Sequence, residues 1–336
     1  MSLNDSIPLF FAEGARRMAL AIEGPDCFVA CAHTRPDGDA AGSLAAAAHI
    51  LKNLGKRFFL YSASGLPHTL DFFPMPVKVW RSLAEAPFEP ECMLALDCSE
   101  VSRLDGEMAS LVQGGIDCIN IDHHLGSTGF GNLGNWIEPA AAATAQLMAY
   151  LAISAGKSLA GNLGESIALG LVTDTGGFCH GNTSADVFSL CALLEREGCS
   201  IPELREHLSR GMSLGSFHLW GSLMQRTRLM DNGRVAFCLA RLADFIKCGC
   251  SREDLEGFVE RMRSIARARV AALLCEERGG VCKFSLRSHG PVDVRAMAAG
   301  LGGGGHFNAA GGTLKMAPEE AEKILLEAIS QGLAAQ

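Results

Sequence analysis

The sequence has no apolar run long enough to cross a membrane. Its most alanine-rich stretches, at 45–48 and 140–143, are interrupted by His49 and Thr144, whereas a membrane-spanning helix needs about 20 mostly apolar residues in succession. The first residues also lack a basic region followed by an apolar core, which is the pattern of a secretion signal. We therefore expect a cytoplasmic protein without a membrane partner.

The sequence also lacks an excess of basic residues. Its formal net charge is −8, and the part from Leu229 onward has a balance of +1, which leaves −9 for the part before it. A protein that grips long nucleic acid usually carries a basic groove, because neutralised phosphates supply most of the affinity. We expect no long nucleic-acid partner, and a polyanionic substrate should be short.

Neither a disulfide framework nor a zinc knuckle is indicated, although the chain has 13 cysteines. Their number is odd, and they are scattered, many of them within apolar runs. Cys248 and Cys250 are the only close pair, and one intervening residue is too few for the usual metal or redox motif. We expect reduced, buried cysteines that pack as small apolar side chains.

The features that are present predict an α/β protein of two domains. At 336 residues the chain is long for one compact domain. In its first part, short apolar runs alternate with helical segments, which indicates a parallel sheet with crossover helices. The expected strands are 27–32, 57–61, 92–96 and 118–121, and the expected helices are 40–54, 101–113, 140–155, 163–172 and 185–197.

A smaller α/β unit is predicted toward the C-terminus. Its expected elements are strands at 234–239, 270–276 and 281–286, a glycine-rich loop at 300–305 and a helix at 318–329. We place the first domain at 1–207, a helical linker at 208–229 and the second domain at 230–336.

Acidic and histidine residues follow four apolar segments of the first domain. The clusters are His33–Asp39 (HTRPDGD), Asp97, Asp122–His124 (DHH) and Asp174. We expect them at one carboxyl edge of the sheet, where ligands of such sheets bind. A lone Asp after a strand is usually a helix cap or a turn residue, but capping does not readily account for four such clusters.

Carboxylates gathered at one edge resist burial, because like charges repel. Divalent cations resolve this conflict, and four aspartates with two histidines suit manganese or magnesium better than a thiolate-seeking metal. Such a set suffices for two cations with one bridging carboxylate. Paired cations about 3.5–4 Å apart can hold a hydroxide between them and clamp an attacked phosphoryl group. These residues therefore predict a two-metal phosphoesterase.

The ordered motifs resemble those of the DHH phosphoesterase family, which is named for the triplet that stands here at Asp122–His124. The first motif, His33–Ser43 (HTRPDGDAAGS), matches the family pattern, and Asp97 and Asp174 match its second and fourth motifs. The C-terminal unit resembles the DHH-associated domain, whose hallmark stands at Gly302–Gly312 (GGGGHFNAAGG). The resemblance covers nearly the whole chain and implies a bilobed fold with the active site in the cleft between the lobes.

The resemblance also implies a role for each matched residue. Six residues would bind two divalent cations: His33 and Asp37 the first, Asp39, His123 and Asp174 the second, and Asp97 both. Manganese is the expected metal, with magnesium or cobalt as alternatives. Asp97 and His124 would be catalytic, His124 by donating to a phosphate oxygen as charge builds up in the transition state. The expected substrate-binding residues are Arg287, Ser288, Gly303, Gly304, His306 and Asn308.

The family contains several activities, and the sequence narrows the choice. We expect neither the membrane segment nor the sensory module of the membrane-bound members, and we expect no extra domain of the kind found in RecJ-type exonucleases. The family II pyrophosphatases have a different C-terminal domain, which lacks the glycine-rich hallmark. We expect an oligoribonuclease for short RNA that also accepts adenosine 3′,5′-bisphosphate. The alternatives are a soluble cyclic-di-AMP phosphodiesterase and, in another class, a nucleotide sensor without catalysis. The oligomeric state is open, with a homodimer as one option.

Overall fold

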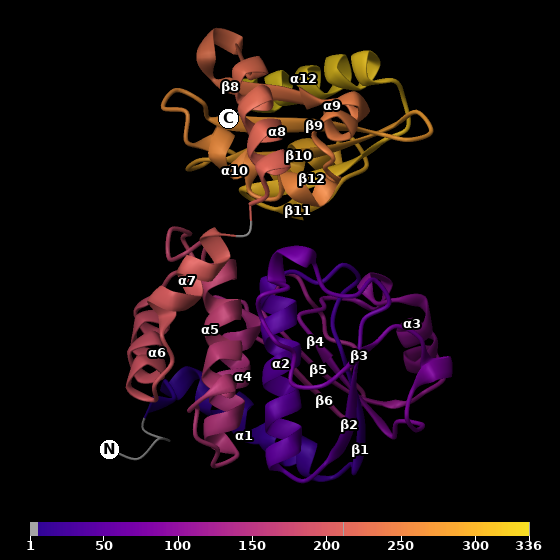
Figure 1. The fold of residues 1–336 in the computed structure, drawn as a ribbon, viewed down its shortest axis with the longest axis vertical. Coiled ribbons are helices and arrows are strands. Elements are labelled where there is room, and N and C mark those ends of the chain that lie inside the picture. Colours follow the sequence, from indigo (N-terminus) through magenta and orange to yellow (C-terminus); the bar gives the residue numbers. More distant parts are fainter. Residues whose placement is uncertain (1–5, 211, 336) are drawn as a thin grey trace. The chain divides into compact units, whose positions relative to one another are not determined.

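The computed structural model describes residues 6–210 and 212–335, apart from the side chain of His306. The chain divides into two compact units, Met1–Gly211 and Met212–Gln336, which we call unit 1 and unit 2 (Figure 1). Unit 1 contains a parallel sheet with helices, and unit 2 contains a second sheet with helices. This confirms the predicted α/β fold class, while the predicted domain limits at 207 and 229 stay predictions.

A six-stranded parallel sheet forms the centre of unit 1, in the order β3-β2-β1-β4-β5-β6. Its strands are β1 (Cys27–Cys31), β2 (Arg57–Tyr61), β3 (Val79–Trp80), β4 (Cys92–Leu96), β5 (Asp117–Asp122) and β6 (Gly134–Ile137). The chain proceeds outward from β1 to β3 and then continues with β4 on the other side of β1. The strand order thus reverses between β1 and β4, and ligands of open α/β sheets bind beside such a reversal.

The strands of unit 1 are apolar along their length because both faces of the sheet are covered. The helices are α1 (Leu9–Glu23), α2 (Gly38–Asn53), α3 (Gly106–Gln113), α4 (Thr144–Ser154), α5 (Asn162–Asp174), α6 (Ala185–Arg196) and α7 (Ile201–Ser209). On one face, Phe28 and Leu94 pack with side chains of α1, α2, α4 and α5, and Figure 1 shows these helices on one side of the sheet. On the other face, Val29 and Met93 pack with α3 and with the connection between β2 and β4. Alternate residues of one strand therefore belong to different cores.

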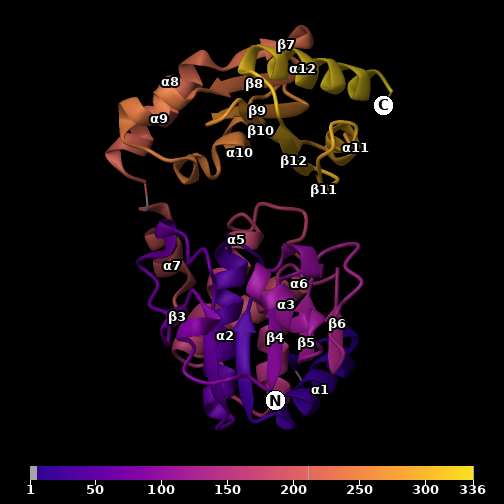
Figure 2. The same ribbon diagram turned by 90° about the vertical axis from the view of Figure 1, so that its right-hand side faces the viewer.

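Unit 2 contains a six-stranded mixed sheet in the order β11-β12-β10-β9-β8-β7, in which β8 and β9 are parallel and the other neighbours antiparallel. Its strands are β7 (Arg228–Met230), β8 (Val235–Ala240), β9 (Val270–Glu277), β10 (Val281–Ser288), β11 (Gly304–His306) and β12 (Ala309–Leu314). Its helices are α8 (Leu214–Arg226), α9 (Leu242–Cys248), α10 (Phe258–Arg263), α11 (Val294–Ala299) and α12 (Pro318–Ala334). The first three helices cover one face of the sheet, and α11 and α12 cover the other (Figure 2).

The helix α8 lies within the range 208–229, which we expected to be a linker. Its side chains Leu219 and Leu223 are fully buried, and they pack with β8 and with α10 in one core of unit 2. The helix therefore contributes to the core of unit 2.

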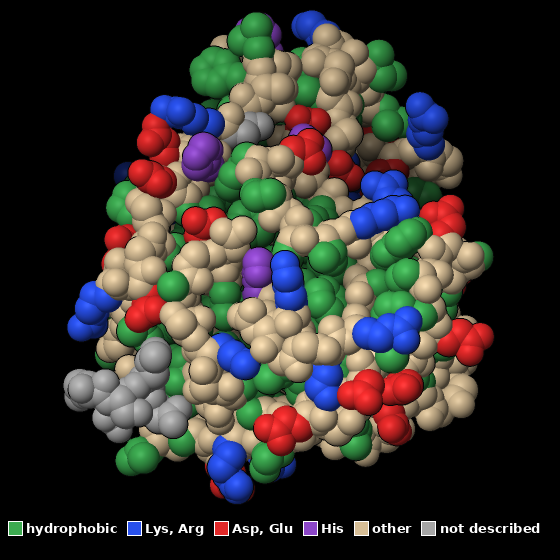
Figure 3. Space-filling model, turned by 60° about the horizontal axis from the view of Figure 1, so that its bottom comes forward, with side chains coloured by type: hydrophobic (Ala, Val, Ile, Leu, Met, Phe, Trp, Pro, Cys, Tyr) green, Lys and Arg blue, Asp and Glu red, His purple; other side chains and the backbone are tan. Residues whose placement is uncertain are grey.

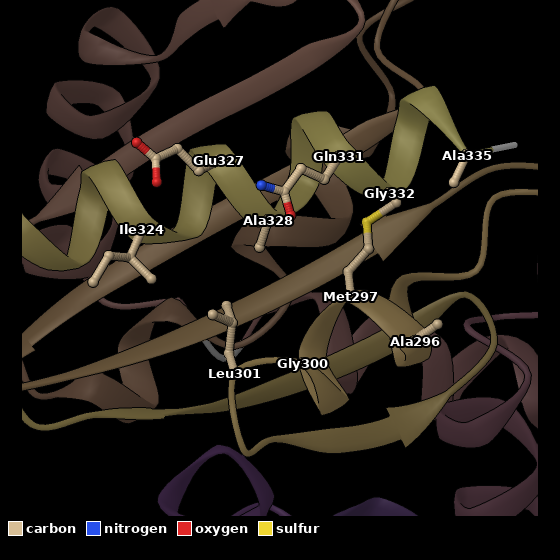
Figure 4. A pocket seen from close by; sticks show the side chains of 10 residues that line it. All are labelled: Ala296, Met297, Gly300, Leu301, Ile324, Glu327, Ala328, Gln331, Gly332 and Ala335. Atoms are coloured by element: carbon tan, nitrogen blue, oxygen red, sulfur yellow. The ribbon is translucent and has the colours of Figure 1, made fainter.

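A groove of about 430 Å³ lies between α11 and α12 (Figure 4). Its lining is mainly apolar, with Met297, Leu301 and Ile324, and Glu327 is the charged side chain in it. A single carboxylate with no histidine or basic residue beside it in the lining does not supply the groups that phosphate ester hydrolysis needs. We therefore do not place the active site in this groove.

The described surface mixes charges of both signs. On the face drawn in Figure 3, Lys and Arg side chains stand apart from one another, with Asp and Glu side chains among them. Most of the cysteines are buried, as predicted, and Cys179 is the one exposed among them. Within residues 6–210 and 212–335, no helix combines the length and the apolar character that a membrane crossing requires.

Candidate metal centre

The carboxyl ends of three neighbouring strands bring the predicted acidic and histidine residues of unit 1 together. The contributors are His33, Asp37 and Asp39 after β1, Asp97 after β4, and Asp122, His123 and His124 from the end of β5. Asp174 comes from elsewhere in the fold, as the last residue of α5. Because β1 and β4 flank the reversal of strand order, the cluster occupies the ligand-binding edge of the sheet.

The two carboxylate oxygens of Asp37 have different partners: one caps a helix, and the other faces the cluster. Its Oδ1 accepts hydrogen bonds from the backbone N–H groups of Asp39 and Ala40, both at 3.1 Å, and so caps α2. Its Oδ2 lies 3.9 Å from His33 Nε2. The Nδ1 of His33 is 3.0 Å from the carbonyl oxygen of Thr34, a contact that directs Nε2 toward the carboxylates. One oxygen of Asp37 thus caps a helix, and the other is left for a cation.

Asp97 faces three histidines from the middle of the cluster. Its φ of 53° lies in the left-handed region, which aspartate tolerates better than most residues, and 1% of its surface is exposed. Its Oδ2 lies 3.6 Å from His33 Nε2, and its Oδ1 lies 3.6 Å from His123 Nε2 and 3.5 Å from His124 Nδ1. The hydroxyl of Thr144 donates to Oδ1 at 3.1 Å. The two oxygens of one carboxylate therefore face different histidines.

The imidazole of His123 meets the remaining carboxylates. Its Nε2 lies 3.8 Å from Asp39 Oδ2 and 3.5 Å from Asp174 Oδ2. Its Nδ1 lies 3.3 Å from the carbonyl oxygen of Ala141. Metal-binding histidines commonly engage a carbonyl or carboxylate with the second ring nitrogen in this way, because the contact fixes the ring orientation.

Asp39 is held by the start of α4 and by close packing against α5. Its Oδ2 accepts a hydrogen bond from the N–H of Thr144 at 2.6 Å, and its Oδ1 accepts one from the N–H of Ala145 at 2.9 Å. A Cβ at Gly170 of α5 would lie 2.5 Å from Asp39 Oδ1 and 2.4 Å from the Cβ of Ala145. Glycine at this position therefore lets α2, α4 and α5 meet beside the cluster.

His124 is held at both ring nitrogens. Its Nδ1 lies 2.7 Å from Asp122 Oδ1, and its Nε2 lies 3.3 Å from Arg103 Nη1. Burial alone would raise the pKa of Asp122, but the hydrogen bond from His124 lowers it. We did not identify Arg103 from the sequence, because a single arginine forms no motif. Its place on the connection after β4 is the signal that could have revealed it.

The electrostatics show that the cluster lacks positive charge. Burial and neighbouring carboxylates raise the pKa of Asp39 well above its usual value and that of Asp174 to about 6. Burial alone would lower the pKa of His123, but the surrounding aspartates raise it to about 9. Burial would also raise the pKa of Asp97, yet the hydrogen bond from His33 and the histidine charges lower it. The cluster thus retains protons where cations would supply the missing charge.

The ligand atoms form three groups, in each of which they lie within 4.8 Å of one another. The groups are His33 with Asp37 and Asp97, Asp39 with His123 and Asp174, and Asp97 with His123 and His124. Carboxylate and imidazole donors without thiolates fit manganese or magnesium. All six predicted ligands thus belong to one cluster, with Asp97 in two of the groups, while their individual roles stay predictions.

The predicted substrate-binding residues lie in unit 2, at the end of β10 and around the β11–β12 turn. Asn308 Nδ2 donates to Ser288 Oγ at 2.8 Å, and that hydroxyl donates to the carbonyl oxygen of Val292 at 2.6 Å. A Cβ at Gly303 would lie 2.3 Å from the carbonyl oxygen of Gly311, so close packing requires glycine there.

Two further predicted residues complete this part of unit 2. Gly304 begins β11, and a Cβ there would meet open space. His306 ends the same strand, but its side chain lies outside the described residues.

Arg287 is joined to a carboxylate that we did not identify from the sequence. Its Nε donates to Glu260 Oε1, and the Nε of Arg263 lies 3.0 Å from Oε2 of the same carboxylate. Its Nη1 donates to the carbonyl oxygen of Leu286 at 3.0 Å. Glu260 thus lies between two arginines and restrains the guanidinium of Arg287.

Comparison with known proteins relates both units to one family. Residues 28–172 match the model of the DHH family, N-terminal domain, and residues 235–335 match that of the DHHA1 domain. The chain is 34% identical over 315 residues to the bifunctional oligoribonuclease and PAP phosphatase NrnA of Thermus thermophilus, covering 93% of this chain and 91% of that protein.

Solved structures show the same fold. An exopolyphosphatase-related protein from Bacteroides fragilis is similar with a TM-score of 0.88 and 25% identity, over 95% of this chain and 96% of that chain. The exonuclease RecJ bound to manganese has a TM-score of 0.53 and 16% identity, over 98% of this chain and 96% of that chain. The likeness to RecJ concerns the fold alone.

Proposed function

This chain belongs to the DHH family of phosphoesterases, and we propose that it hydrolyses short oligoribonucleotides with the help of two divalent cations, preferably manganese. The observation that carries this proposal is the convergence of the ligand groups at the carboxyl edge of the unit 1 sheet. The relative in Thermus thermophilus, an oligoribonuclease and PAP phosphatase, supports this substrate class. It also favours adenosine 3′,5′-bisphosphate (PAP) as a second substrate.

Each half of the cluster would hold one cation. The first would be held by His33, Asp37 and Asp97, and the second by Asp39, His123 and Asp174, with Asp97 shared. When bound, such a pair of cations supplies the Lewis acidity that activates water and offsets charge on the phosphoryl group.

The remaining residues of the cluster orient these ligands and face the substrate. Thr144 fixes Asp97 through its hydroxyl and Asp39 through its backbone N–H. Asp122 holds the ring of His124. We assign His124 to the substrate side of the site, since it lies beside Asp97 but completes neither of the two cation sets.

We assign the binding of the rest of the substrate to unit 2. The residues are Arg287, Ser288, Gly303, Gly304, His306 and Asn308. A glycine-rich turn lets backbone N–H groups approach a phosphate without a Cβ in the way. The guanidinium of Arg287, restrained by Glu260, adds a charged donor.

One parallel assay tests the function. The purified protein is given manganese and, separately, a dinucleotide, a five-nucleotide RNA, adenosine 3′,5′-bisphosphate and cyclic-di-AMP, with a chelator as the control. We expect turnover of the short RNAs that the chelator abolishes. Rapid cyclic-di-AMP turnover beside negligible RNA cleavage would replace this proposal with the signalling activity. Tight nucleotide binding without turnover of any substrate, bis-p-nitrophenyl phosphate included, would indicate a sensor.

A further inference from the structure

Arg103 connects two segments of the metal centre that are far apart in the sequence. It is the last residue of the short helix η4 (Val101–Arg103), after β4. Its carbonyl oxygen accepts hydrogen bonds from the N–H and the hydroxyl of Thr34, at 2.9 and 3.2 Å. Its guanidinium Nη1 lies 3.3 Å from His124 Nε2. The backbone of Arg103 is thus tied to the segment after β1, and its side chain to the segment after β5.

The direction of these hydrogen bonds follows from the chemistry of arginine. A guanidinium has donors only and stays protonated, so Arg103 donates and His124 Nε2 accepts. The Nδ1 of the same ring then carries the hydrogen and donates it to Asp122 Oδ1 at 2.7 Å. In this arrangement Nε2 has no hydrogen for a phosphate oxygen. The donor at this point of the site is the guanidinium that His124 holds.

No carboxylate of the cluster forms a direct ion pair with Arg103. Among the described residues, Asp37, Asp97 and Asp174 face histidines, and Asp122 is joined to Arg103 only through the ring of His124. The other N–H groups of this guanidinium have no acceptor in the described part of the chain. A permanent cation that is oriented but forms no direct ion pair suits an anion from outside, and its planar N–H pairs match two phosphate oxygens.

We propose that Arg103 binds the attacked phosphoryl group, and that Asp122 and His124 position its guanidinium. This inference rests on the proposed function, since it takes the substrate to be a phosphate ester. Arg103 is then a catalytic residue, because its N–H groups meet the non-bridging oxygens on which charge increases in the transition state. His124 is a positioning residue that acts through the arginine.

The first test compares variants of the full-length protein loaded with manganese. Arg103→Ala should lower kcat for a dinucleotide about 100-fold, with the manganese content and the unfolding temperature of the wild type. Arg103→Lys should recover part of kcat, because it keeps the charge but not the planar fork. Arg196→Ala is the control. Arg196 ends α6, where its Nε donates to the carbonyl oxygen of Ala192, and this variant should behave as the wild type.

A second measurement does not depend on turnover. Inorganic phosphate, titrated into the manganese-loaded protein in a calorimeter, should bind at least about tenfold more weakly to Arg103→Ala than to the wild type. Added methylguanidinium should restore part of the activity of Arg103→Ala and leave Arg196→Ala unchanged.

Three results would overturn the inference. The first is that Arg103→Ala has the same kcat and phosphate affinity as the wild type. The second is that Arg103→Ala loses manganese in proportion to its loss of activity. The third is a fall in unfolding temperature in both Arg103→Ala and Arg103→Lys that accounts for the lost activity. A failure of the proposed function appears instead in the wild type, as an absence of short-RNA turnover, and the phosphate titration still decides the role of Arg103.

Discussion

One oxygen of Asp37 accepts a hydrogen bond from the backbone N–H of Asp39 at 3.1 Å, so the first aspartate of this segment fixes the backbone that carries the second. The same oxygen accepts a hydrogen bond from the N–H of Ala40 and caps α2. The other oxygen of Asp37 faces His33. Suitable substitutions can therefore separate the cap from the proposed ligand.

Asp37→Ser should keep the cap and lose the ligand, whereas Asp37→Ala should lose both. Serine is a good N-cap residue, and replacing such a cap by alanine costs about 1 kcal/mol. We expect both variants to bind manganese more weakly, and only Asp37→Ala to have a lower free energy of unfolding in chelator. Denaturant unfolding and manganese titration of the two proteins decide this. Full manganese affinity in Asp37→Ser would remove Asp37 from the ligand set.

The neighbouring histidines of the triplet should respond differently to alanine. His123→Ala should lower both metal affinity and rate, because Nε2 of His123 faces Asp39, Asp97 and Asp174. His124→Ala should leave the metal content near normal and lower kcat by up to about 100- to 1000-fold, the usual cost of losing a transition-state donor, because the guanidinium of Arg103 loses the ring that positions it. Elemental analysis and single-turnover kinetics measure the two effects. Equal metal loss in both variants would contradict this assignment.

The metal-free protein should lose stability as the pH rises from about 6.5 to about 9. The folded state raises the pKa of His123 to about 9, above the value of about 6.5 for an unfolded histidine. The folded protein therefore binds more protons in this window. The stabilisation from His123 is complete below about pH 6.5 and is lost as the pH passes about 9.

The expected loss is about 3 kcal/mol, measured by denaturant unfolding in chelator at the two ends of the window. His123→Asn should flatten the profile. Manganese should reverse it, since binding requires the neutral imidazole. A metal-free wild type with constant stability from pH 6.5 to pH 9 would show that His123 does not hold its proton against the aspartates.

The preference for short RNA should be visible as a length profile. We expect kcat/KM to be highest for two to five nucleotides and to fall toward about 25 nucleotides, a length beyond any single-domain footprint on single-stranded RNA. Because few phosphates would be contacted, the salt dependence should be shallow. The measurement is kcat/KM against length at two ionic strengths. A flat or rising profile with a steep salt slope would indicate a groove for long nucleic acid.

The sequence predicts the strands of unit 1 well where a short apolar run stands out from its flanking segments. The segments 27–32, 57–61, 92–96 and 118–121 agree with β1, β2, β4 and β5 to within one residue at each end. We did not predict β6 (Gly134–Ile137), because glycine and asparagine in a run of four residues give no strand pattern. The strand order was also not predictable, since pairing depends on contacts between segments that the sequence separates.

The residues of the candidate site likewise include some that could be predicted from the sequence and some that could not. Residues within motifs, such as His33 and His123, could be predicted because several chemically related side chains lie close together in the chain. Thr144 and Arg103 could not, because each meets its partner across a long stretch of sequence: the Thr144 hydroxyl binds Asp97, 47 residues away, and the Arg103 guanidinium binds His124, 21 residues away. Their roles come from the fold and not from any local pattern.

Gly170 has no functional group, yet a genetic screen for inactive variants should detect it among the catalytic positions. A methyl group at this position would overlap the Asp39 carboxylate on one side and the Cβ of Ala145 on the other. Even the smallest replacement, alanine, would displace a proposed ligand. A position of this kind is easily misjudged when alleles are ranked by chemical similarity, because glycine to alanine in a helix normally favours folding.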